Sequence, residues 1–304
     1  HEAGQPLFRA IDFSQAETGD LPFKGKPRPD VVHAWTPREL VRETVTNITQ
    51  RFSCPYIVHL EDNETRITFD EIVPDSMSLS RRIPSQVADL LVAKHRSHPE
   101  RAEGFLRGSS GITILIDRLQ EFVPKGVPAH LFWPGFDPAF AHLPSRESAR
   151  LRLGLDSRSI VLAYTGSAHQ SNSDEIRSLV AAVAILHRDG LPVCLLKTGV
   201  DHVSQDWSDL REIAPIVRHL GFVSRSQLSD ILSAADVLVQ PGRPGPFNDY
   251  RFPSKLPDFL VSCRPVILPK TNLGRFLEDG RQAILLETGC PEEMAEKVRM
   301  LAKD

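Results

Sequence analysis

The chain has 304 residues, of which 41% are hydrophobic and 25% are charged, and its formal net charge is -3. This length allows two domains of about 150 residues each, and the charge gives no electrostatic footprint for nucleic acid. No stretch approaches the roughly 20 apolar residues that span a bilayer, and the N-terminus is not typical of a signal peptide. These features predict a cytoplasmic protein without a transmembrane segment, and they leave peripheral membrane contact open.

The cysteines and acidic residues argue against a bound metal. Cys54, Cys194, Cys263 and Cys290 are far apart and lack the paired spacing of a zinc site or a redox motif. They are typical of reduced, small hydrophobic residues in the cytosol. No Asp-any-Asp motif occurs in the chain, so we expect neither a divalent ion on a diphosphate nor another cofactor.

After a loop-rich segment over residues 1–29, the first half alternates strand and helix. Apolar runs over 30–35 and 55–60 predict strands, and the pattern between them predicts a helix over 38–52. Such a unit implies two parallel strands. Because ligands gather at the carboxyl ends of parallel strands, His33 and Trp35 are candidate site residues on the first strand.

An acidic cluster, Glu61-Asp62-Asn63-Glu64, follows the second strand. It is either an acceptor-side group, with Glu61 as a candidate base or sugar-hydroxyl ligand, or a solvated loop, which is the commoner fate of such charge runs. His33 has two interpretations as well, because a histidine at this position is often simply packed in the strand.

The rest of the first half predicts helices over 84–98 and 117–122 and strands over 111–116 and 129–133. Pro138, Pro144 and Ser145 then interrupt the regular pattern and indicate a hinge between residues 138 and 148. We therefore predict an N-terminal domain over residues 1–143 and a C-terminal domain over residues 144–304.

The second half predicts another parallel sheet, with helices between its strands. Candidate ligand groups follow two of these strands. They are Gly166 with Ser167 after the first and Lys197 near the polar end of the second. The third strand ends in Gly221-Phe222-Val223. Lys197 is open to two interpretations, a phosphate contact or a surface residue whose ammonium snorkels to water.

The stretch from Gln240 to Pro269 reads as strand, loop, helix and strand. We expect the helix to begin near Pro253 and Ser254, because proline suits the first turn and serine can cap free amides. A helix N-terminus with Lys255 beside it would form an anion site. Asp258, one turn later, could accept hydrogen bonds from a ribose diol. The alternative is a helix start whose Lys and Asp are merely solvated.

The segment PSKLPDFLVSCRPVI resembles the donor-binding helix of nucleotide-sugar glycosyltransferases of the GT-B fold, near family four. The helix ending in Ala-Asp-Val before the strand at 237 matches the same family. In that family an acidic residue at the position of Asp258 holds the ribose. The better-known members carry a glutamate where this chain has Tyr250, with Asp249 beside it, so the chain resembles a variant Pro-Ser-Lys subgroup.

Other positions depart from the family pattern. His33 matches the first of two family histidines, and Trp35 replaces the second. Members usually carry Arg just after the glycine at 166 and Lys a few residues on, so here Lys255, with Arg251 or Arg243, would supply the positive charge. The resemblance implies two doubly wound Rossmann-like α/β domains facing across a cleft. It also implies that the chain, which begins at His1 and stops inside a helical pattern, is truncated at both ends.

The resemblance implies a glycosyltransferase of hexosyltransferase type that moves a sugar, with retention and without metal, from a UDP-, GDP- or ADP-linked donor. The acceptor would be a glycan, a lipid or a small molecule. The implied catalytic residues are His33, Trp35, Glu61 and Asp249. The implied donor-binding residues are Gly166, Ser167, Lys197, Phe222, Val223, Arg251, Pro253, Ser254, Lys255 and Asp258. Two alternatives stay open on the same fold, a nucleotide-sugar epimerase or hydrolase and a non-catalytic sugar-nucleotide-binding protein.

Overall fold

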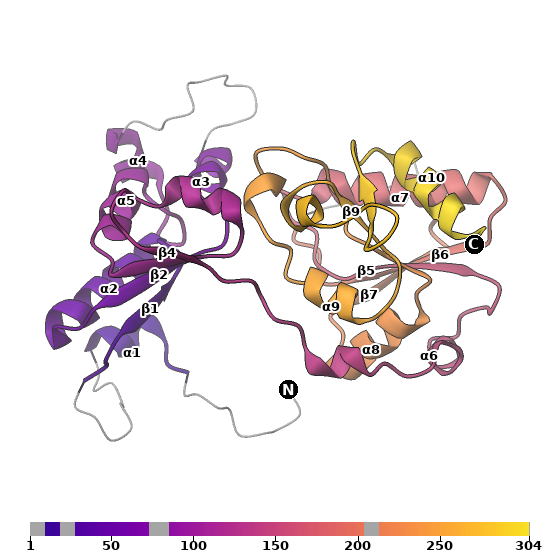
Figure 1. The fold of residues 1–304 in the computed structure, drawn as a ribbon, viewed down its shortest axis with the longest axis horizontal. Helices are drawn as coiled ribbons and strands as arrows, with labels where there is room; N and C mark the ends of the chain where they lie inside the picture. Colours follow the sequence, from indigo (N-terminus) through magenta and orange to yellow (C-terminus); the bar gives the residue numbers. More distant parts are fainter. Residues whose placement is uncertain (1–9, 19–27, 73–84, 204–212, 304) are drawn as a thin grey trace. The chain divides into compact units, whose positions relative to one another are not determined.

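The computed structural model describes residues 10–18, 28–72, 85–203 and 213–303 (Figure 1). The chain forms two compact units. The first runs to Trp133 and includes Tyr250–Phe252, and the second contains Pro134–Asp249 and the chain from Pro253 onward. The units therefore divide ahead of the predicted boundary between residues 143 and 144. Among the described helices, none combines the length and apolar composition of a membrane-spanning segment.

The first unit is built on a four-stranded parallel sheet with the order β1-β2-β3-β4. Its strands are β1 (Val32–Trp35), β2 (Tyr56–Leu60), β3 (Gly111–Ile114) and β4 (Ala129–Leu131). Its register pairs Trp35 with His59 and His59 with Thr113. These polar and aromatic residues therefore share one face of the sheet, because successive side chains on a strand point to opposite faces.

Among the helices of the first unit, α2 confirms the helix predicted over residues 38–52. The helix predicted over 84–98 is shorter than expected, and α3 was not predicted. The helices of this unit are α1 (Phe13–Thr18), α2 (Glu39–Phe52), α3 (Glu64–Ile72), α4 (Ser85–Leu91), α5 (Pro99–Arg107) and the 3-10 helix η1 (Asp117–Phe122). The predicted helix over 84–98 ends at Leu91 because the following carbonyls accept the first amides of α2. The Glu39 N–H lies 2.9 Å from the Arg96 oxygen, and the Leu40 N–H lies 2.9 Å from the Lys94 oxygen.

Helix α3 begins inside the acidic cluster, where the sequence indicated only a loop. The Asn63 side-chain oxygen accepts the Arg66 N–H at 2.9 Å, as a residue that caps a helix does. The first N–H groups of a helix have no carbonyl partner within the helix, and this side-chain hydrogen bond satisfies one of them. A capping asparagine followed by an acidic residue in the first turn, Glu64, was the signal in the sequence that could have predicted α3.

The second unit contains a six-stranded parallel sheet with the order β10-β9-β8-β5-β6-β7. Its strands are β5 (Ile160–Tyr164), β6 (Val193–Thr198), β7 (Val217–Gly221), β8 (Val237–Val239), β9 (Val266–Pro269) and β10 (Ile284–Leu286). The chain adds β6 and β7 on one side of β5 and then returns to add β8, β9 and β10 on the other side. This is the doubly wound order of a dinucleotide-binding fold.

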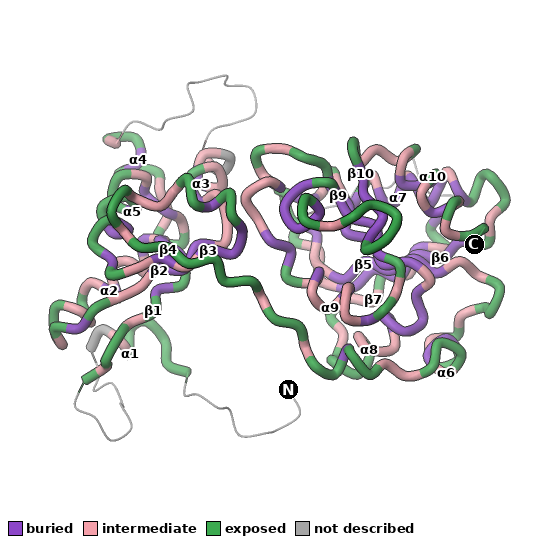
Figure 2. Tube along the Cα trace, viewed as in Figure 1, coloured by how far each residue is buried: buried purple, intermediate pink, exposed green. Residues whose placement is uncertain are grey.

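Helices cover both faces of this sheet (Figure 1). Its helical segments are α6 (Arg146–Arg152), α7 (Ser173–Arg188), α8 (Arg225–Ala234), α9 (Leu256–Val261), α10 (Pro291–Leu301), η2 (Pro138–Ala141), η4 (Asn248–Tyr250) and η5 (Asn272–Phe276). Leu162, Leu195 and Ile267 of the strands join Leu179 of α7 and Val298 of α10 in one buried core. Figure 2 shows the central strands of this unit buried and the loops at its edges exposed.

Helix α9 is shorter than predicted and begins later. It starts at Leu256, with Pro257 in its first turn, while Pro253 and Ser254 precede it. Ser254 is therefore exposed and lies outside the helix, and the N-cap residue is Lys255. With only six residues, α9 contributes a small dipole at its N-terminus, so any positive charge near this turn comes mainly from Lys255.

Asp236, at the end of α8, holds the start of the second unit together. Its carboxylate accepts the Arg150 guanidinium at 2.5 Å and the Val161 N–H at 2.8 Å. Arg150 is buried and also donates to the carbonyl oxygens of Ala234 and Ser159. The pair thus fixes α6, α8 and β5 against one another.

We expect Asp236→Ala to lower the free energy of unfolding by about 3 kcal/mol, because it leaves a buried guanidinium without its anion. The matched control is Asp230→Ala, which breaks the more exposed Arg152–Asp230 pair on the same two helices. That change should cost no more than about 1 kcal/mol. Urea unfolding followed by circular dichroism measures both, and equal losses would show that Arg150 does not depend on Asp236.

Candidate functional site

The doubly wound order creates a switch point between β5 and β8. The connections from these neighbouring strands leave in opposite directions. In sheets of this kind the ligand crevice lies beyond the carboxyl ends of the strands at this point. Gly166 lies just after β5 and Gln240 just after β8. Lys255 reaches the same place, because its Nζ lies 3.1 Å from Gln240 Oε1.

The Lys255 ammonium is held in one position by two groups of this crevice. Its Nζ lies 4.4 Å from the centroid of the Tyr164 ring, which is a cation–π contact. Tyr164 is 2% exposed and so gives the ammonium a rigid wall. Together, the ring face and the Gln240 oxygen orient a half-buried positive charge at the sheet edge.

Gly166 makes room for this charge. Its φ is +151°, and a Cβ there would lie 3.0 Å from Lys255 Nζ and 3.2 Å from the Tyr164 hydroxyl. A side chain at 166 would therefore push the lysine out of its place. The predicted donor-binding residues Gly166 and Lys255 are thus brought together by the structure.

The turn after β6 packs tightly against the turn after β5. Gly199, with a φ of +88°, sits so close that a Cβ would lie 2.5 Å from the Ser167 nitrogen. Ser167 Oγ accepts the Val200 N–H at 3.1 Å, so this hydroxyl is used in holding the turn. Ser167 lies at the switch point as predicted, and its hydroxyl has a structural contact.

The structure excludes one of the two interpretations of Lys197, that of a surface residue. Its side chain is 1% exposed, so it is not a surface residue whose ammonium reaches water. The Nζ instead forms an ion pair with Asp201 Oδ1 at 2.5 Å. Asp201, which the sequence did not single out, also accepts the Ala168 N–H at 2.9 Å.

Asp258 already accepts a hydrogen bond in the structure. Its Oδ1 takes the Asp137 N–H at 2.9 Å, and the Asp137 carboxylate in turn pairs with Arg225. Burial raises the pKa of Asp258, and the charge of Asp137 adds to that effect. These contacts tie the segment around Asp137 to α8 and α9, and so explain why the second unit begins before the predicted hinge.

Further donor-side and catalytic candidates of the second unit are a carboxylate, Asp249, and two apolar residues, Phe222 and Val223. Asp249 Oδ1 accepts the Thr271 hydroxyl and the Gly245 N–H, the latter at 3.2 Å, so this carboxylate braces a loop. Phe222, just after β7, is 88% exposed, and Val223 beside it is half-buried. An exposed phenyl ring at the sheet edge is available to stack on a ligand.

The catalytic candidates of the first unit surround His59. The Trp35 ring lies 4.2 Å from the His59 ring, and His33 lies 5.5 Å from Trp35. His59 is buried, and its Nδ1 lies 2.6 Å from Thr113 Oγ1. Burial and the nearby His33 lower the pKa of His59 to about 4, so the His59 ring is neutral at pH 7. Trp35 remains 49% exposed at the end of β1.

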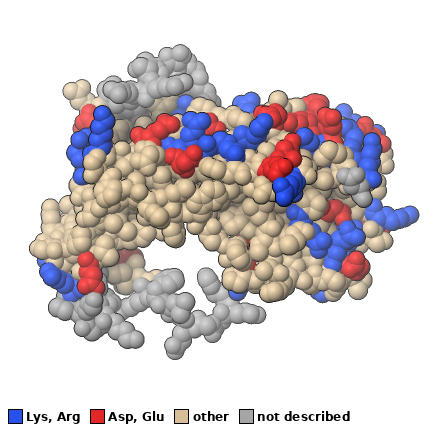
Figure 3. All heavy atoms as spheres, in the orientation of Figure 1, with Lys and Arg blue, Asp and Glu red and all other residues tan. Residues whose placement is uncertain are grey.

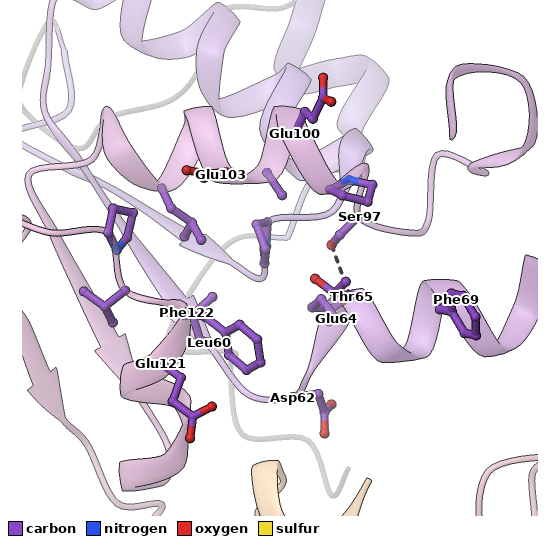
Figure 4. A pocket seen from close by; sticks show the side chains of 16 residues that line it. Leu60, Asp62, Glu64, Thr65, Phe69, Ser97, Glu100, Glu103, Glu121 and Phe122 are labelled. Carbon is purple, nitrogen blue, oxygen red and sulfur yellow. Dashed lines mark hydrogen bonds between the residues drawn. The ribbon is translucent and has the colours of Figure 1, made fainter. Parts of the chain in front are cut away.

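A cavity of about 640 Å³ opens within the first unit, between the loops after β1 and β2 and the helices α3, α5 and η1 (Figure 4). Leu60 and Phe122 line it together with several carboxylates. These are Asp62, Glu64, Glu100, Glu103 and Glu121. The sequence did not predict this cavity, because α3 and the start of α5 were not expected.

Two members of the acidic cluster are not solvated loop residues. Glu64 is buried and paired with Arg38 at 2.9 Å, and the Ser97 hydroxyl donates to it at 3.2 Å, as the dashed line in Figure 4 marks. Burial raises the pKa of Asp62 to about 6, with the charge of Glu64 next in effect, while Arg251 opposes the rise. Arg251 belongs to the first unit.

Glu61 lies beside this cavity wall without being one of its lining residues. It is half-buried, and burial raises its pKa, while a hydrogen bond with Trp35 acts in the opposite direction. The structure therefore brings together Trp35 and Glu61 of the predicted catalytic set. The His33 ring contacts the Trp35 ring, with the centroids 5.5 Å apart, and the His59 ring, with the centroids 5.9 Å apart.

The raised pKa of Asp62 predicts a pH-dependent stability effect. A carboxyl whose pKa is higher in the folded state than the usual 3.8 stabilises the fold below pH 3.8, and that contribution is lost as pH rises through about 6. Asp62→Asn should therefore raise the free energy of unfolding at pH 8 by roughly 1 kcal/mol, a value reduced because the carboxyl is only half-buried and keeps some contact with solvent. At pH 4 it should change little.

Urea unfolding followed by tryptophan fluorescence tests this, since Trp35 and Trp133 both lie in the first unit. Glu103→Gln, at an exposed carboxyl of the same cavity wall that pairs with Arg107, is the matched control. A gain for Asp62→Asn that is the same at pH 4 and pH 8 would contradict the assigned cause.

Charges elsewhere on the molecule are mixed. Figure 3 shows Lys and Arg side chains beside Asp and Glu side chains on the face drawn there. Surface ion pairs such as Arg146–Asp236, Lys270–Glu287 and Arg299–Asp189 agree with this mixture. Among the described residues, no three His, Cys, Asp or Glu side chains are grouped to hold a metal ion.

Solved glycosyltransferase structures are similar to this chain in fold. Anabaena Alr3699/HepE in complex with UDP and glucose matches with a TM-score of 0.60 and 16% identity, over 90% of this chain and 68% of that one. Sucrose-phosphate synthase from Thermosynechococcus elongatus matches with a TM-score of 0.64 and 13% identity, over 90% and 65%. WaaG, a glycosyltransferase involved in lipopolysaccharide biosynthesis, matches with a TM-score of 0.62 and 15% identity, over 87% and 73%.

No curated protein matches the chain in sequence. The structural likeness, with parallel sheets in mixed α/β units, shows the GT-B fold that the resemblance implied. Residues 159–304, which include the switch point and Lys255, match the family model described as glycosyl transferases group 1.

Proposed function

We propose that the chain is a glycosyltransferase that takes a sugar from a nucleoside-diphosphate donor. The observation that carries this proposal is the Lys255 ammonium, held 3.1 Å from Gln240 Oε1 and over the Tyr164 ring at the switch point. A doubly wound sheet binds its ligand at that point, and a fixed cation there suits a diphosphate. The UDP and glucose bound to the similar Anabaena protein support the same ligand class.

The chemical role of Lys255 is electrostatic. As the bond between the sugar and the diphosphate breaks, negative charge grows on the leaving group, and a cation already in place stabilises that state more than the ground state. Because Tyr164 and Gln240 orient the ammonium before the donor binds, little reorganisation is needed during the reaction. We propose that this charge makes a divalent metal unnecessary.

The acceptor side is assigned to the first unit. Trp35 offers an exposed ring, Glu61 a carboxylate hydrogen-bonded to it, and Asp62 a carboxyl on the neighbouring cavity wall. Aromatic rings and carboxylates are the groups that bind sugar faces and hydroxyls. We propose a glycan, lipid or small-molecule acceptor, transfer of a hexose with retention, and activity in the cytoplasm.

On the donor side, Asp258 is the proposed ribose ligand. Its Oδ1 holds the Asp137 N–H, and a carboxylate has further acceptor sites for a diol. Phe222 and Val223 are the proposed wall for the base, since they follow the third strand of the same sheet edge. The family resemblance near family four, in its Pro-Ser-Lys subgroup, supports these roles.

A donor panel tests the reaction. UDP-, GDP- and ADP-glucose are each incubated with the protein, with and without a panel of glycan, lipid and small-molecule acceptors. Release of the nucleoside diphosphate is followed with and without EDTA, using protein stripped of metal beforehand. We expect release from one donor at a rate that EDTA leaves unchanged, with the product keeping its anomeric configuration by NMR. Formation of epimerised donor would favour an epimerase. Rapid transfer of the sugar to water alone would favour a hydrolase, and donor binding without turnover would favour a non-catalytic protein.

Lys255→Met tests the cation directly, because methionine keeps much of the stem that packs on Tyr164 and removes the charge. We expect binding of the preferred nucleoside diphosphate to weaken by about 1.5–3 kcal/mol, the range for a charge-assisted contact. Lys270→Met is the matched control, since Lys270 pairs with Glu287 on the exposed surface of the same unit. Calorimetry measures the affinity of both variants for the nucleoside diphosphate. An unchanged affinity of the Lys255 variant would remove this residue from the site.

A further inference from the structure

The ion pair between the buried Lys197 and the half-buried Asp201 has no role in the proposed chemistry, yet it lies next to the switch point. Lys197 is 1% exposed on a strand whose side chains are all buried. Burying an ammonium is costly unless an anion pairs with it. Such a pair on a central strand requires a structural or functional reason.

The contacts of Asp201 supply that reason. Its Oδ1 accepts both the Lys197 ammonium, at 2.5 Å, and the Ala168 N–H, at 2.9 Å. The Ala168 carbonyl oxygen in turn accepts the His202 N–H at 2.8 Å. One residue of the turn after β5 is therefore bound through both its amide and its carbonyl group to the turn after β6.

Two further contacts place neighbouring residues of the same turns. Ser167 Oγ accepts the Val200 N–H, and Gly199 lies against the Gly166–Ser167 peptide. The register of β6 with β7 shifts between Lys197 and Thr198, and the Gly199 N–H then donates to the Gly221 oxygen at 2.7 Å. An irregularity of this kind bends a strand locally, here at the end of β6.

We propose that Lys197 and Asp201 are positioning residues that fix the turn Gly166–Ala168 in its donor-binding conformation. Lys197 orients the Asp201 carboxylate, and the carboxylate holds the Ala168 amide. Gly166 then stays where the Lys255 ammonium needs open space. This role rests on the proposed function, because it assigns the turn to the diphosphate.

The reason for using a charged pair is geometric. A carboxylate that must accept an amide and an ammonium through the same oxygen is limited to a narrow range of directions. Charge-assisted bonds are shorter and stronger than neutral ones. The turn is therefore positioned before the donor arrives, which reduces the ordering cost of binding.

The experiment compares Lys197→Met and Asp201→Asn with Lys270→Met, which breaks an exposed lysine–carboxylate pair of the same unit. Hydrogen–deuterium exchange of peptides covering residues 165–172 reports the turn in the absence of any ligand. Calorimetry with UDP, GDP, ADP and inorganic pyrophosphate reports binding. Thermal unfolding reports the stability of each variant.

We expect Lys197→Met to speed exchange in the turn at least tenfold and to weaken both pyrophosphate and the preferred nucleoside diphosphate about tenfold. Asp201→Asn keeps an oxygen that can accept the Ala168 N–H, so this variant should fold. Its exchange rate in the turn should rise less, and its affinities for pyrophosphate and the nucleoside diphosphate should fall less, than those of Lys197→Met. The control should match the wild type in exchange and affinity, whatever its melting temperature.

The outcomes separate this inference from the proposed function. Unchanged exchange in the turn for both variants would overturn the positioning role. Faster exchange with unchanged pyrophosphate affinity would remove the turn from the ligand site and overturn the role in binding. If the wild type binds none of the nucleotides, the proposed function fails, and the exchange data alone still decide whether the pair holds the turn. Should Lys197→Met not fold, Asp201→Asn decides the same points.

Discussion

The placement of one positive charge, the Lys255 ammonium, determines how the second unit is built. A half-buried cation must have partners, and here these are the face of Tyr164 and the oxygen of Gln240. Both partners lie at the ends of neighbouring strands, β5 and β8, whose connections leave in opposite directions. Gly166 must lack a side chain to leave room, and Gly199 must lack one so that the next turn can support Gly166. The strand order, the glycines and the lysine therefore depend on one another.

Much of the fold could be predicted from the sequence, because buried parallel strands are apolar runs and α2 and α7 carry a clear helical period. The failures have local physical causes. The segment over 92–96 has helical composition, but its carbonyl groups accept the first amides of α2, a contact between distant residues. Helix α3 depends on one side-chain cap from Asn63. At α9 the first turn contains Pro257, so the earlier Pro253, an equally good start by its composition, lies outside the helix.

The site was predicted unevenly for similar reasons. Lys255 and Gly166 could be named because a motif and a strand end marked them. Asp201 could not, since a single acidic residue in a short turn gives no signal until its partners, Lys197 and Ala168, are placed in space. The two interpretations of Lys197 both assumed that its charge faces solvent or ligand, and neither considered a buried partner four residues later. The cavity of the first unit required α3 and α5 together, and the sequence indicated neither.

The two units treat buried charge differently, and this difference matches the roles proposed for them. In the second unit the charges near the switch point are paired or held before any ligand is present, as Lys197 with Asp201 and Lys255 with the Tyr164 ring show. A diphosphate has the same charge in every donor, so a fixed, preorganised site is efficient. In the first unit the burial of Asp62 raises its pKa to about 6, which means that its charged form is under-stabilised at neutral pH. A ligand that donates hydrogen bonds to this carboxylate would relieve that cost, so binding energy and fold stability act on the same group there.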